Sequence, residues 1–174
     1  MNSCNSGDNF GTMIKIERAT TPTQDVRDLI QELEADLSSE YPPEQRHGLS
    51  LDAIFQPHVR FFVATIGENA VGCGGIALFP TFAEVKRMYV REACRGQGVA
   101  DAIIARLESE ARDAGLGELK LETGTEQAAA LRFYKRCGFK ECGPFEPYKS
   151  MPEQSIVTSV FLEKNLEKLN AHCF

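Results

Sequence analysis

The spacing of hydrophobic residues changes repeatedly along the chain, and each change predicts a different element. Ile14 and Ile16 alternate with polar neighbours, which is the period of two typical of a half-buried strand. Between residues 24 and 38 the apolar side chains recur every three or four positions, which predicts a helix that ends near Ser39, before the prolines at 42–43. Similar patterns predict strands at residues 13–18, 59–66, 71–79, 84–90, 119–123, 139–142 and 156–162, and further helices at 99–114 and 126–137.

These elements alternate between strand and helix through the middle of the chain, and a hairpin joined at residues 67–69 precedes them. That order predicts an α/β protein with a mixed central sheet and helices on both faces. Gly72, Gly74 and Gly75 interrupt the second strand of the hairpin. Glycines inside a strand indicate a bulge or the close approach of another backbone.

A glycine-rich turn at residues 95–101 lies between the strand at 84–90 and the helix that starts at Val99. The first N–H groups of a helix have no partner within the helix and lie at its positive end, so this arrangement favours an anion such as a phosphate. A nucleoside triphosphate loop would need Lys and Ser or Thr after Gly98, and neither follows it. A dinucleotide-binding oxidoreductase would need a third glycine or alanine where Asp101 stands.

The remaining pattern, Arg95-x-x-Gly98-x-Ala100, resembles the pyrophosphate loop of the GNAT superfamily of acetyl-CoA-dependent N-acetyltransferases. Residues 131–139 (LRFYKRCGF) resemble the second signature of that family, a helix that carries tyrosine and ends in Gly-Phe. The resemblance covers roughly residues 59–164. It implies a layered GNAT-like α/β fold in which the cofactor lies between two central strands that splay apart.

The resemblance also implies how acetyl-CoA is bound as a cosubstrate. The main chain of Met88, Tyr89 and Val90 is expected to pair with the pantetheine arm as an added strand would. Gln127 stands where many members carry a cofactor-binding asparagine. The pyrophosphate is expected to meet the turn that is formed by Arg95, Gly96, Gln97, Gly98, Val99, Ala100 and Asp101.

Acetyl transfer to an amine needs a group that removes a proton from the amine and one that protonates the leaving thiolate. Glu84 is our candidate base: it stands eleven residues before Arg95, where histone-acetylating members keep a glutamate, and it would act through water. Strand alternation is expected to place Glu84, Lys86 and Met88 on one face. A strand-end glutamate that merely faces solvent is the alternative interpretation.

Tyr134 resembles the family tyrosine beside the sulfur and is our candidate acid, although an aromatic core residue would show the same pattern. Residues 40–52 are the least patterned stretch and are expected either to connect elements or to form a wall of the acceptor site. Glu122 and Tyr148 are weaker candidates for the acceptor opening.

Composition bounds these hypotheses. The chain of 174 residues has a formal net charge of −6, which disfavours a nucleic-acid partner. No apolar run reaches the length of a membrane helix, and the six cysteines and three histidines form no metal-binding pattern, so we expect neither membrane nor metal, and free thiols in the cytoplasm. Residues 1–12 are expected to be a disordered leader, and residues 13–174 a single domain whose tail from Glu163 is helical.

The sequence therefore predicts an N-acetyltransferase that moves an acetyl group from acetyl-CoA to a primary amine of a small molecule or peptide, by direct attack in a ternary complex. A monomer or a homodimer would be compatible with this activity. The alternative function is a non-catalytic acyl-CoA-binding regulatory module.

Overall fold

The structure is a computed structural model, and it describes residues 13–166. The predicted leader at residues 1–12 lies outside the described part. The strands are β1 (Ile14–Ala19), β2 (Val59–Ile66), β3 (Asn69–Leu78), β4 (Ala83–Val90), β5 (Glu118–Gly124), β6 (Lys140–Cys142) and β7 (Ser159–Asn165). The α-helices are α1 (Gln24–Ser38), α2 (Val99–Asp113), α3 (Ala128–Arg136) and α4 (Glu153–Ile156), and the short 3-10 helices are η1 (Pro43–Gln45), η2 (Ala53–Phe55), η3 (Glu92–Cys94) and η4 (Tyr148–Ser150).

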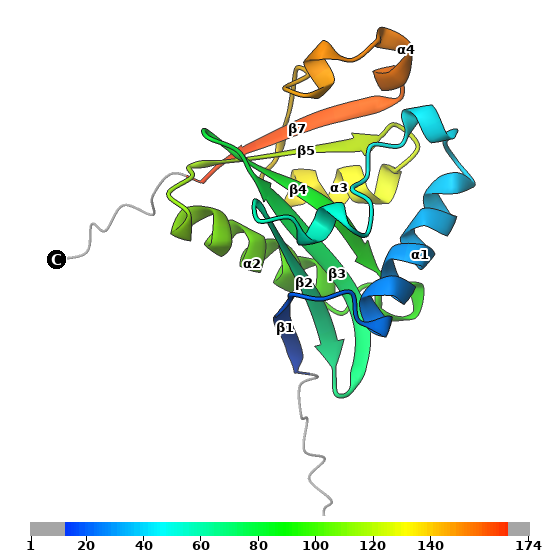
Figure 1. The fold of residues 1–174 in the computed structure, drawn as a ribbon, viewed down its shortest axis with the longest axis vertical. Helices are drawn as coiled ribbons and strands as arrows, with labels where there is room; N and C mark the ends of the chain where they lie inside the picture. Colours follow the sequence, from blue (N-terminus) through cyan, green and yellow to red (C-terminus); the bar gives the residue numbers. More distant parts are fainter. Residues whose placement is uncertain (1–12, 167–174) are drawn as a thin grey trace, which may run out of the picture.

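These strands form a seven-stranded mixed sheet in the order β1-β2-β3-β4-β5-β7-β6. Neighbouring strands are antiparallel except β4 and β5, which run parallel and pair only at Ala83 with Leu119 and at Glu84 with Lys120. Beyond these two pairs β4 and β5 diverge, so that β5 and β7 separate from the rest of the sheet in Figure 1. The predicted fold and its splayed central strands are therefore confirmed.

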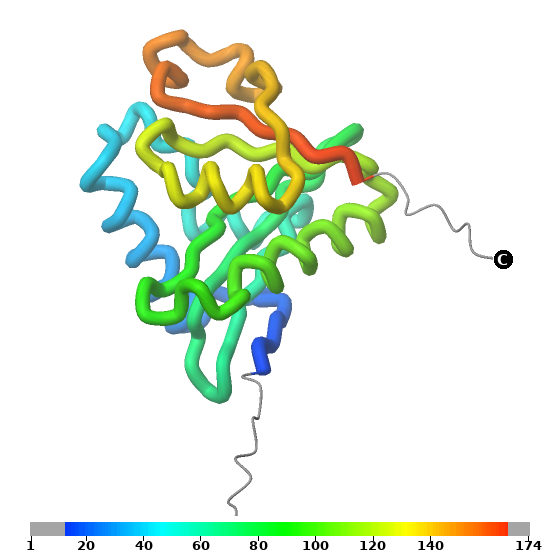
Figure 2. The backbone as a smooth tube through the Cα atoms, turned by 180° about the vertical axis from the view of Figure 1, so that it is seen from behind, coloured from blue at the N-terminus to red at the C-terminus, as the bar shows by residue number. Residues whose placement is uncertain are grey.

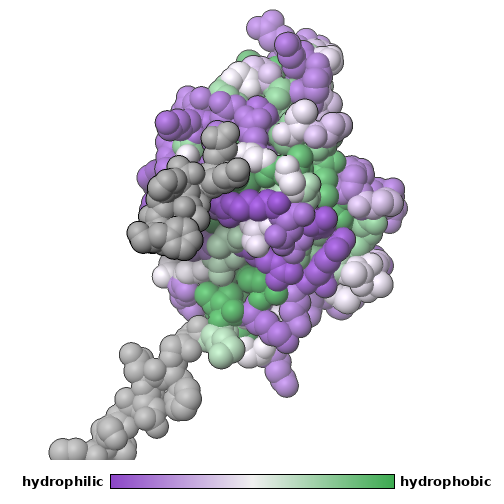
Figure 3. Space-filling view, turned by 90° about the vertical axis from the view of Figure 1, so that its left-hand side faces the viewer, coloured by the Kyte–Doolittle hydropathy of each residue, from purple (hydrophilic) through white to green (hydrophobic). Residues whose placement is uncertain are grey.

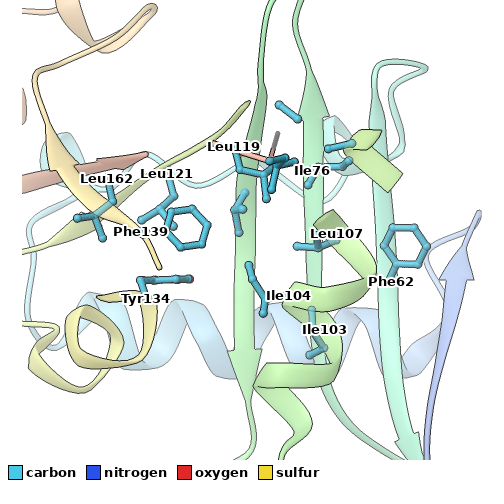
Figure 4. Packing of buried hydrophobic residues seen from close by; sticks show 14 of the residues in the cluster. Phe62, Ile76, Ile103, Ile104, Leu107, Leu119, Leu121, Tyr134, Phe139 and Leu162 are labelled. Carbon is cyan, nitrogen blue, oxygen red and sulfur yellow. The ribbon is translucent and has the colours of Figure 1, made fainter. Parts of the chain in front are cut away.

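Helices cover both faces of the sheet. Figure 2 shows α2 and α3 on one face, and α1 lies on the other. On the α2 side, Ile103, Ile104 and Leu107 pack against the strands, while Tyr134 of α3 lies beside Phe139 (Figure 4). Burial of such aliphatic side chains contributes roughly 1.5–3 kcal/mol each to the stability of the fold.

Most element boundaries agree with the hydrophobic pattern. The side chain of Thr23 caps α1 by accepting a hydrogen bond from the N–H of Val26. The last long strand differs: it begins at Ser159, not at residue 156, because residues 153–156 form the helical turn α4. Residues 163–165 belong to this strand and not to a helical tail, and residues 167–174 lie outside the described part.

The predicted alternation of side chains along β4 is wrong, because the strand contains a bulge. Pairing with β3 shifts register between Cys73 and Gly75, and Arg87 has a positive φ of 56°. The extra residue puts Lys86 and Arg87 on the α1 side together and turns Met88 to the α2 side. Glu84 and Lys86 therefore do not share a face with Met88, because the alternation holds only for a regular strand.

The glycines of β3 make room at this bulge. A Cβ on Gly74 would lie 2.6 Å from the Met88 sulfur and 2.7 Å from Ile103, and a Cβ on Gly72 would lie 2.7 Å from the carbonyl oxygen of Tyr89. Separations below 3.0 Å force a displacement, so larger residues would push β3 away from β4 and α2. The close backbone approach, one of the two predicted alternatives, is therefore present, while the extra residue of this bulge lies in β4 and not in β3.

The visible surface is predominantly polar. Figure 3 shows one face on which hydrophilic side chains prevail and hydrophobic ones gather in smaller areas between them. Within residues 13–166, the exposed large hydrophobic residues are Met13 and Val157. No helix in that range is long and apolar enough to cross a membrane. Cysteines 73, 94, 137 and 142 carry free thiols.

Candidate active site

The glycine turn has the geometry that an anion site requires. Gly96 and Gly98 adopt φ values of 76° and 85°, which residues with a side chain rarely adopt. Gly98 is the N-cap of α2, and a Cβ on either glycine would meet no atom within 4 Å. The turn therefore presents bare backbone and the helix N-terminus to open space, which fits a pyrophosphate.

The charged side chains of the turn are compatible with this fit. Asp101, which stands in the third-glycine position, is held by the guanidinium group of Arg136 in two hydrogen bonds of 2.9 and 3.2 Å. Its charge is thus neutralised locally. Arg95 is about half exposed; its Nε donates to the carbonyl oxygen of Val90 at 3.0 Å, and its Nη2 lies 3.6 Å from the Asp36 carboxylate. Gln97 donates to the carbonyl of Ala93 and lines neither adjacent cavity.

A groove of about 790 Å³ leads from this turn along the opening between the splayed strands. Met88, Tyr89 and Val90 line it on one side, and Gln127 and Tyr134 on the other. Because β5 leaves β4 after Glu84, the edge of β4 faces the groove without a neighbouring strand. An extended ligand can therefore lie along the predicted pairing edge. The volume is within the range of small-molecule sites.

A second, smaller cavity of about 140 Å³ opens into the same region from the α1 side. Met88, Gln127 and Tyr134 line both cavities, so the two meet at these side chains. Tyr134 is 7% exposed, and burial raises the pKa of its phenol, which keeps it protonated at neutral pH. Tyr134 thus lies at the junction of the two cavities, while the Gln127 amide also contacts the Glu40 carboxylate at the rim.

Glu84 occupies a different place from the expected one. Its side chain is 1% exposed and does not line the smaller cavity. Its Oε1 accepts a hydrogen bond of 2.5 Å from the Tyr148 hydroxyl and lies 2.8 Å from the Lys86 Nζ. Glu84 is therefore neither a solvated strand end nor in contact with the smaller cavity.

Glu122 is the carboxylate that faces the smaller cavity. Ser159 donates a hydrogen bond of 2.6 Å to its Oε1. Burial raises the pKa of the Glu122 carboxyl, and the charge of Glu84 adds to the shift. A raised pKa brings a carboxyl closer to the range in which it can accept a proton and release it again at neutral pH.

Tyr148 does not line this opening. It is fully buried, and its hydroxyl also accepts a hydrogen bond of 2.5 Å from Lys86. Burial, followed by the nearby Glu84 charge, raises the pKa of its phenol, so that Tyr148 stays neutral. Tyr148 therefore orients the side chains of Glu84 and Lys86 through its hydroxyl group and does not itself reach the cavity.

Residues 40–52 do form a wall of the smaller cavity, through the side chains of Tyr41, Gln45, Arg46 and His47. Arg46 and Arg87 are the site residues that the sequence reasoning missed. Arg46 stands in an unpatterned segment, and Arg87 lies in the bulge, so neither carried a signal that could be read without the fold.

The layered α/β fold, with its splayed central strands and two meeting cavities, is that of an acyltransferase. The chain belongs to the acetyltransferase (GNAT) family, whose sequence pattern matches residues 24–139. This membership favours an enzyme over the non-catalytic binding module and sets aside the dinucleotide-binding oxidoreductase.

Known relatives agree with this assignment. An IAA acetyltransferase of Azospirillum brasilense is 42% identical over 149 residues, which cover 84% of this chain and 94% of the relative. A solved structure from Klebsiella pneumoniae, described as an acyl-CoA N-acyltransferase, shares 32% identity and a TM-score of 0.70, covering 90% of this chain and 99% of the other. The PaiA N-acetyltransferase of Thermoplasma acidophilum, solved with coenzyme A, covers 87% of this chain and 99% of its own, with a TM-score of 0.65; at 16% identity it supports the fold alone.

Proposed function

We propose that this enzyme transfers an acetyl group from acetyl-CoA to a primary amine, with both substrates bound at once. The observation that carries the proposal is the junction of the two cavities at Met88, Gln127 and Tyr134. An acyl group at the end of the groove would meet an acceptor in the pocket there. Holding two reactants in contact in this way contributes much of the rate enhancement in a bimolecular reaction.

The donor is held by backbone groups. The turn at Gly96–Asp101 would bind the pyrophosphate, with Arg95 as a further contact, and the edge of β4 from Met88 to Val90 would pair with the amides of the pantetheine arm. Acetyl-CoA supplies an acyl thioester when it is bound, and the chain positions that thioester and protects it from water.

The reaction requires one proton to leave the amine and one to reach the sulfur. As the amine nitrogen forms its bond to the acyl carbon, the carbon–sulfur bond breaks and its electron pair goes to sulfur. We propose that Glu122 takes the proton of the amine and that Tyr134 donates to the sulfur. Glu84, predicted as the base, would act through Lys86 and Tyr148, which it orients, and not by contact with the acceptor.

An amine panel tests the proposal. Free CoA, detected with a thiol reagent, should appear only when acetyl-CoA and an acceptable amine are both present, and mass spectrometry should find the acetylated amine. IAA, which appears in the name of the Azospirillum relative, is assayed beside the amine panel as a separate candidate acceptor. Titration calorimetry should show acetyl-CoA binding without an acceptor. Binding without turnover of any amine would instead support a regulatory module.

A further inference from the structure

The walls of the smaller cavity carry opposite charges, and this arrangement indicates the kind of acceptor. Glu122 lies on the β5 side, while Arg46 and Arg87 lie on the side formed by residues 40–52 and the β4 bulge. Both guanidinium groups share one carboxylate, Glu34: Arg46 donates to it at 3.1 Å, and Arg87 forms a closer ion pair. Two cations and one anion leave this wall with one positive charge in excess.

Two nitrogen atoms of this positive wall have no hydrogen-bond partner within the described part of the chain. The Nε of Arg46 is buried and makes no hydrogen bond, and the Nη1 of Arg87 faces Glu34 without hydrogen-bond geometry. A buried charged donor without an acceptor costs about 1–3 kcal/mol or more, so such groups are expected to have partners in the working protein. The nearby Lys86 is already occupied by Glu84 and Tyr148.

The backbone is strained at Arg87, and neighbouring residues hold its side chain in place. Arg87 holds a left-handed φ of 56°, which costs roughly 1–2 kcal/mol for a residue with a side chain. Gly48 leaves space for it, because a Cβ there would collide with the Arg87 guanidinium group. The Nε of Arg87 is fixed on the carbonyl oxygen of Leu49 at 2.6 Å. Strain of this kind persists where the surrounding structure holds it and is frequent at ligand-binding sites.

We propose that the acceptor is a zwitterion, a primary amine that also carries a free carboxylate as an amino acid does, with the carboxylate at Arg46 and the amine at Glu122. This inference rests on the proposed function and narrows it. The excess positive charge and the unpartnered Nε match a carboxylate, whereas an amine without one would leave both uncompensated. A free amino acid is thereby favoured over the N-terminus of a peptide, because the α-carboxyl group of an N-terminal residue is part of an uncharged peptide bond.

The test compares three forms of each acceptor: the amino acid, its carboxamide and the corresponding decarboxylated amine. Hydrogen bonds to charged groups are worth about 1.5–3 kcal/mol, so kcat/KM for the acid should exceed that for the carboxamide by about 10- to 100-fold. The carboxamide carries a less basic amine, more of which is neutral at a given pH. This difference favours the carboxamide, so the basicity of the amine cannot produce a preference for the acid.

Variants of Arg46 then test whether this residue causes the preference for the acid over the carboxamide. Arg46→Gln should reduce the ratio of kcat/KM for acid over carboxamide to within about threefold of one, and Arg46→Lys should retain an intermediate ratio because it keeps the charge without the planar fork. Arg60→Gln is the matched control: Arg60 is similarly exposed, 25% against 22%, and pairs with a single glutamate, Glu110, away from the cavity. It should keep both the activity and the ratio.

The outcomes separate this inference from the proposed function. Equal or better turnover of carboxamides and decarboxylated amines would overturn the zwitterion and leave the N-acetyltransferase intact, as would a preference for acids that Arg46→Gln does not change. Absence of turnover with every amine, while acetyl-CoA binds, would refute both. Thermal melts of the variants show whether a lost ratio reflects a lost fold.

Discussion

Glu84→Gln and Glu122→Gln each remove one negative charge, yet we expect them to have different consequences. The Glu84 carboxylate is 1% exposed and lies 2.8 Å from the Lys86 ammonium, which is 12% exposed. Glutamine keeps the shape and can still accept from Tyr148, but it leaves Lys86 without its anion. For Glu84→Gln we therefore expect mainly a loss of stability, with a loss of activity as its consequence.

The magnitude follows from the burial of the pair. Removing one partner of a buried ion pair costs about 3–5 kcal/mol. We expect the lower end, because Lys86 also reaches the carbonyl oxygen of His47 at 3.4 Å. At about 2–4 °C per kcal/mol for a chain of this size, Tm should fall by roughly 6–12 °C. Glu118→Gln is the control: it breaks a more exposed contact to Lys120, and the cost should stay below about 1 kcal/mol.

Activity distinguishes the two carboxylates. If Glu122 takes the proton from the amine, Glu122→Gln should lower kcat/KM by about 10²–10⁴-fold near neutral pH, with a smaller deficit at high pH, where free amine is abundant. Glu84→Gln should show a loss that is nearly uniform with pH. The reverse pattern, a pH-dependent deficit for Glu84→Gln and none for Glu122→Gln, would return the base role to Glu84 and refute the reasoning from burial.

Three further results are expected. Gly98→Asp should weaken acetyl-CoA binding at least tenfold in titration calorimetry, whereas Gly115→Asp, with a similar φ of 77° and equally open surroundings at the other end of α2, should not; equal effects would reduce the turn to a structural element. Tyr134→Phe should lower kcat more than it raises KM for acetyl-CoA, and an unchanged kcat with rate-limiting chemistry would assign Tyr134 to packing alone. Burial raises the pKa of Glu122 above its usual value of 4.5, so ionisation of this carboxyl destabilises the folded state at pH values above 4.5 and has no effect below that pH. Glu122→Gln should therefore raise Tm relative to the unmodified chain at pH 8 but not at pH 4. A difference in Tm that is the same at both pH values would exclude this cause.

The sequence predicted the order of strands and helices because local periodicity determines it. Helix α2 was expected at residues 99–114 and spans Val99–Asp113, since its apolar spacing and the glycines around it define both ends. The glycine turn and Tyr134 could be proposed from the sequence because each belongs to a short continuous stretch, residues 95–101 and 131–139, that resembles a family signature. The start of β7 was missed, because Val157 continues an alternation that the helical turn α4 interrupts.

The residues of the proposed acceptor cavity could not be identified in this way, because they come from separate segments. Arg46 follows η1, Arg87 lies in β4 and Glu122 lies in β5, and the three line one cavity only because β4 and β5 splay. The pairing of Glu84 with Tyr148 joins positions 64 residues apart. No periodicity in one segment predicts such a contact, and an expectation of solvent exposure was reasonable for a glutamate at the start of a strand.

The bulge at Arg87 explains why one strand can serve both substrates in the proposed reaction. A regular strand would turn Glu84, Lys86 and Met88 to the same face. The extra residue instead leaves Lys86 and Arg87 toward the smaller cavity and turns Met88 toward α2, while the following backbone runs along the donor groove. The separation between the donor edge and Arg87 is thereby set within β4 itself, between the residues that pair with Gly75 and Cys73 of β3. In the proposed reaction, the strained backbone at Arg87 would place an acceptor contact and a donor contact on opposite faces of the sheet within adjacent residues of β4.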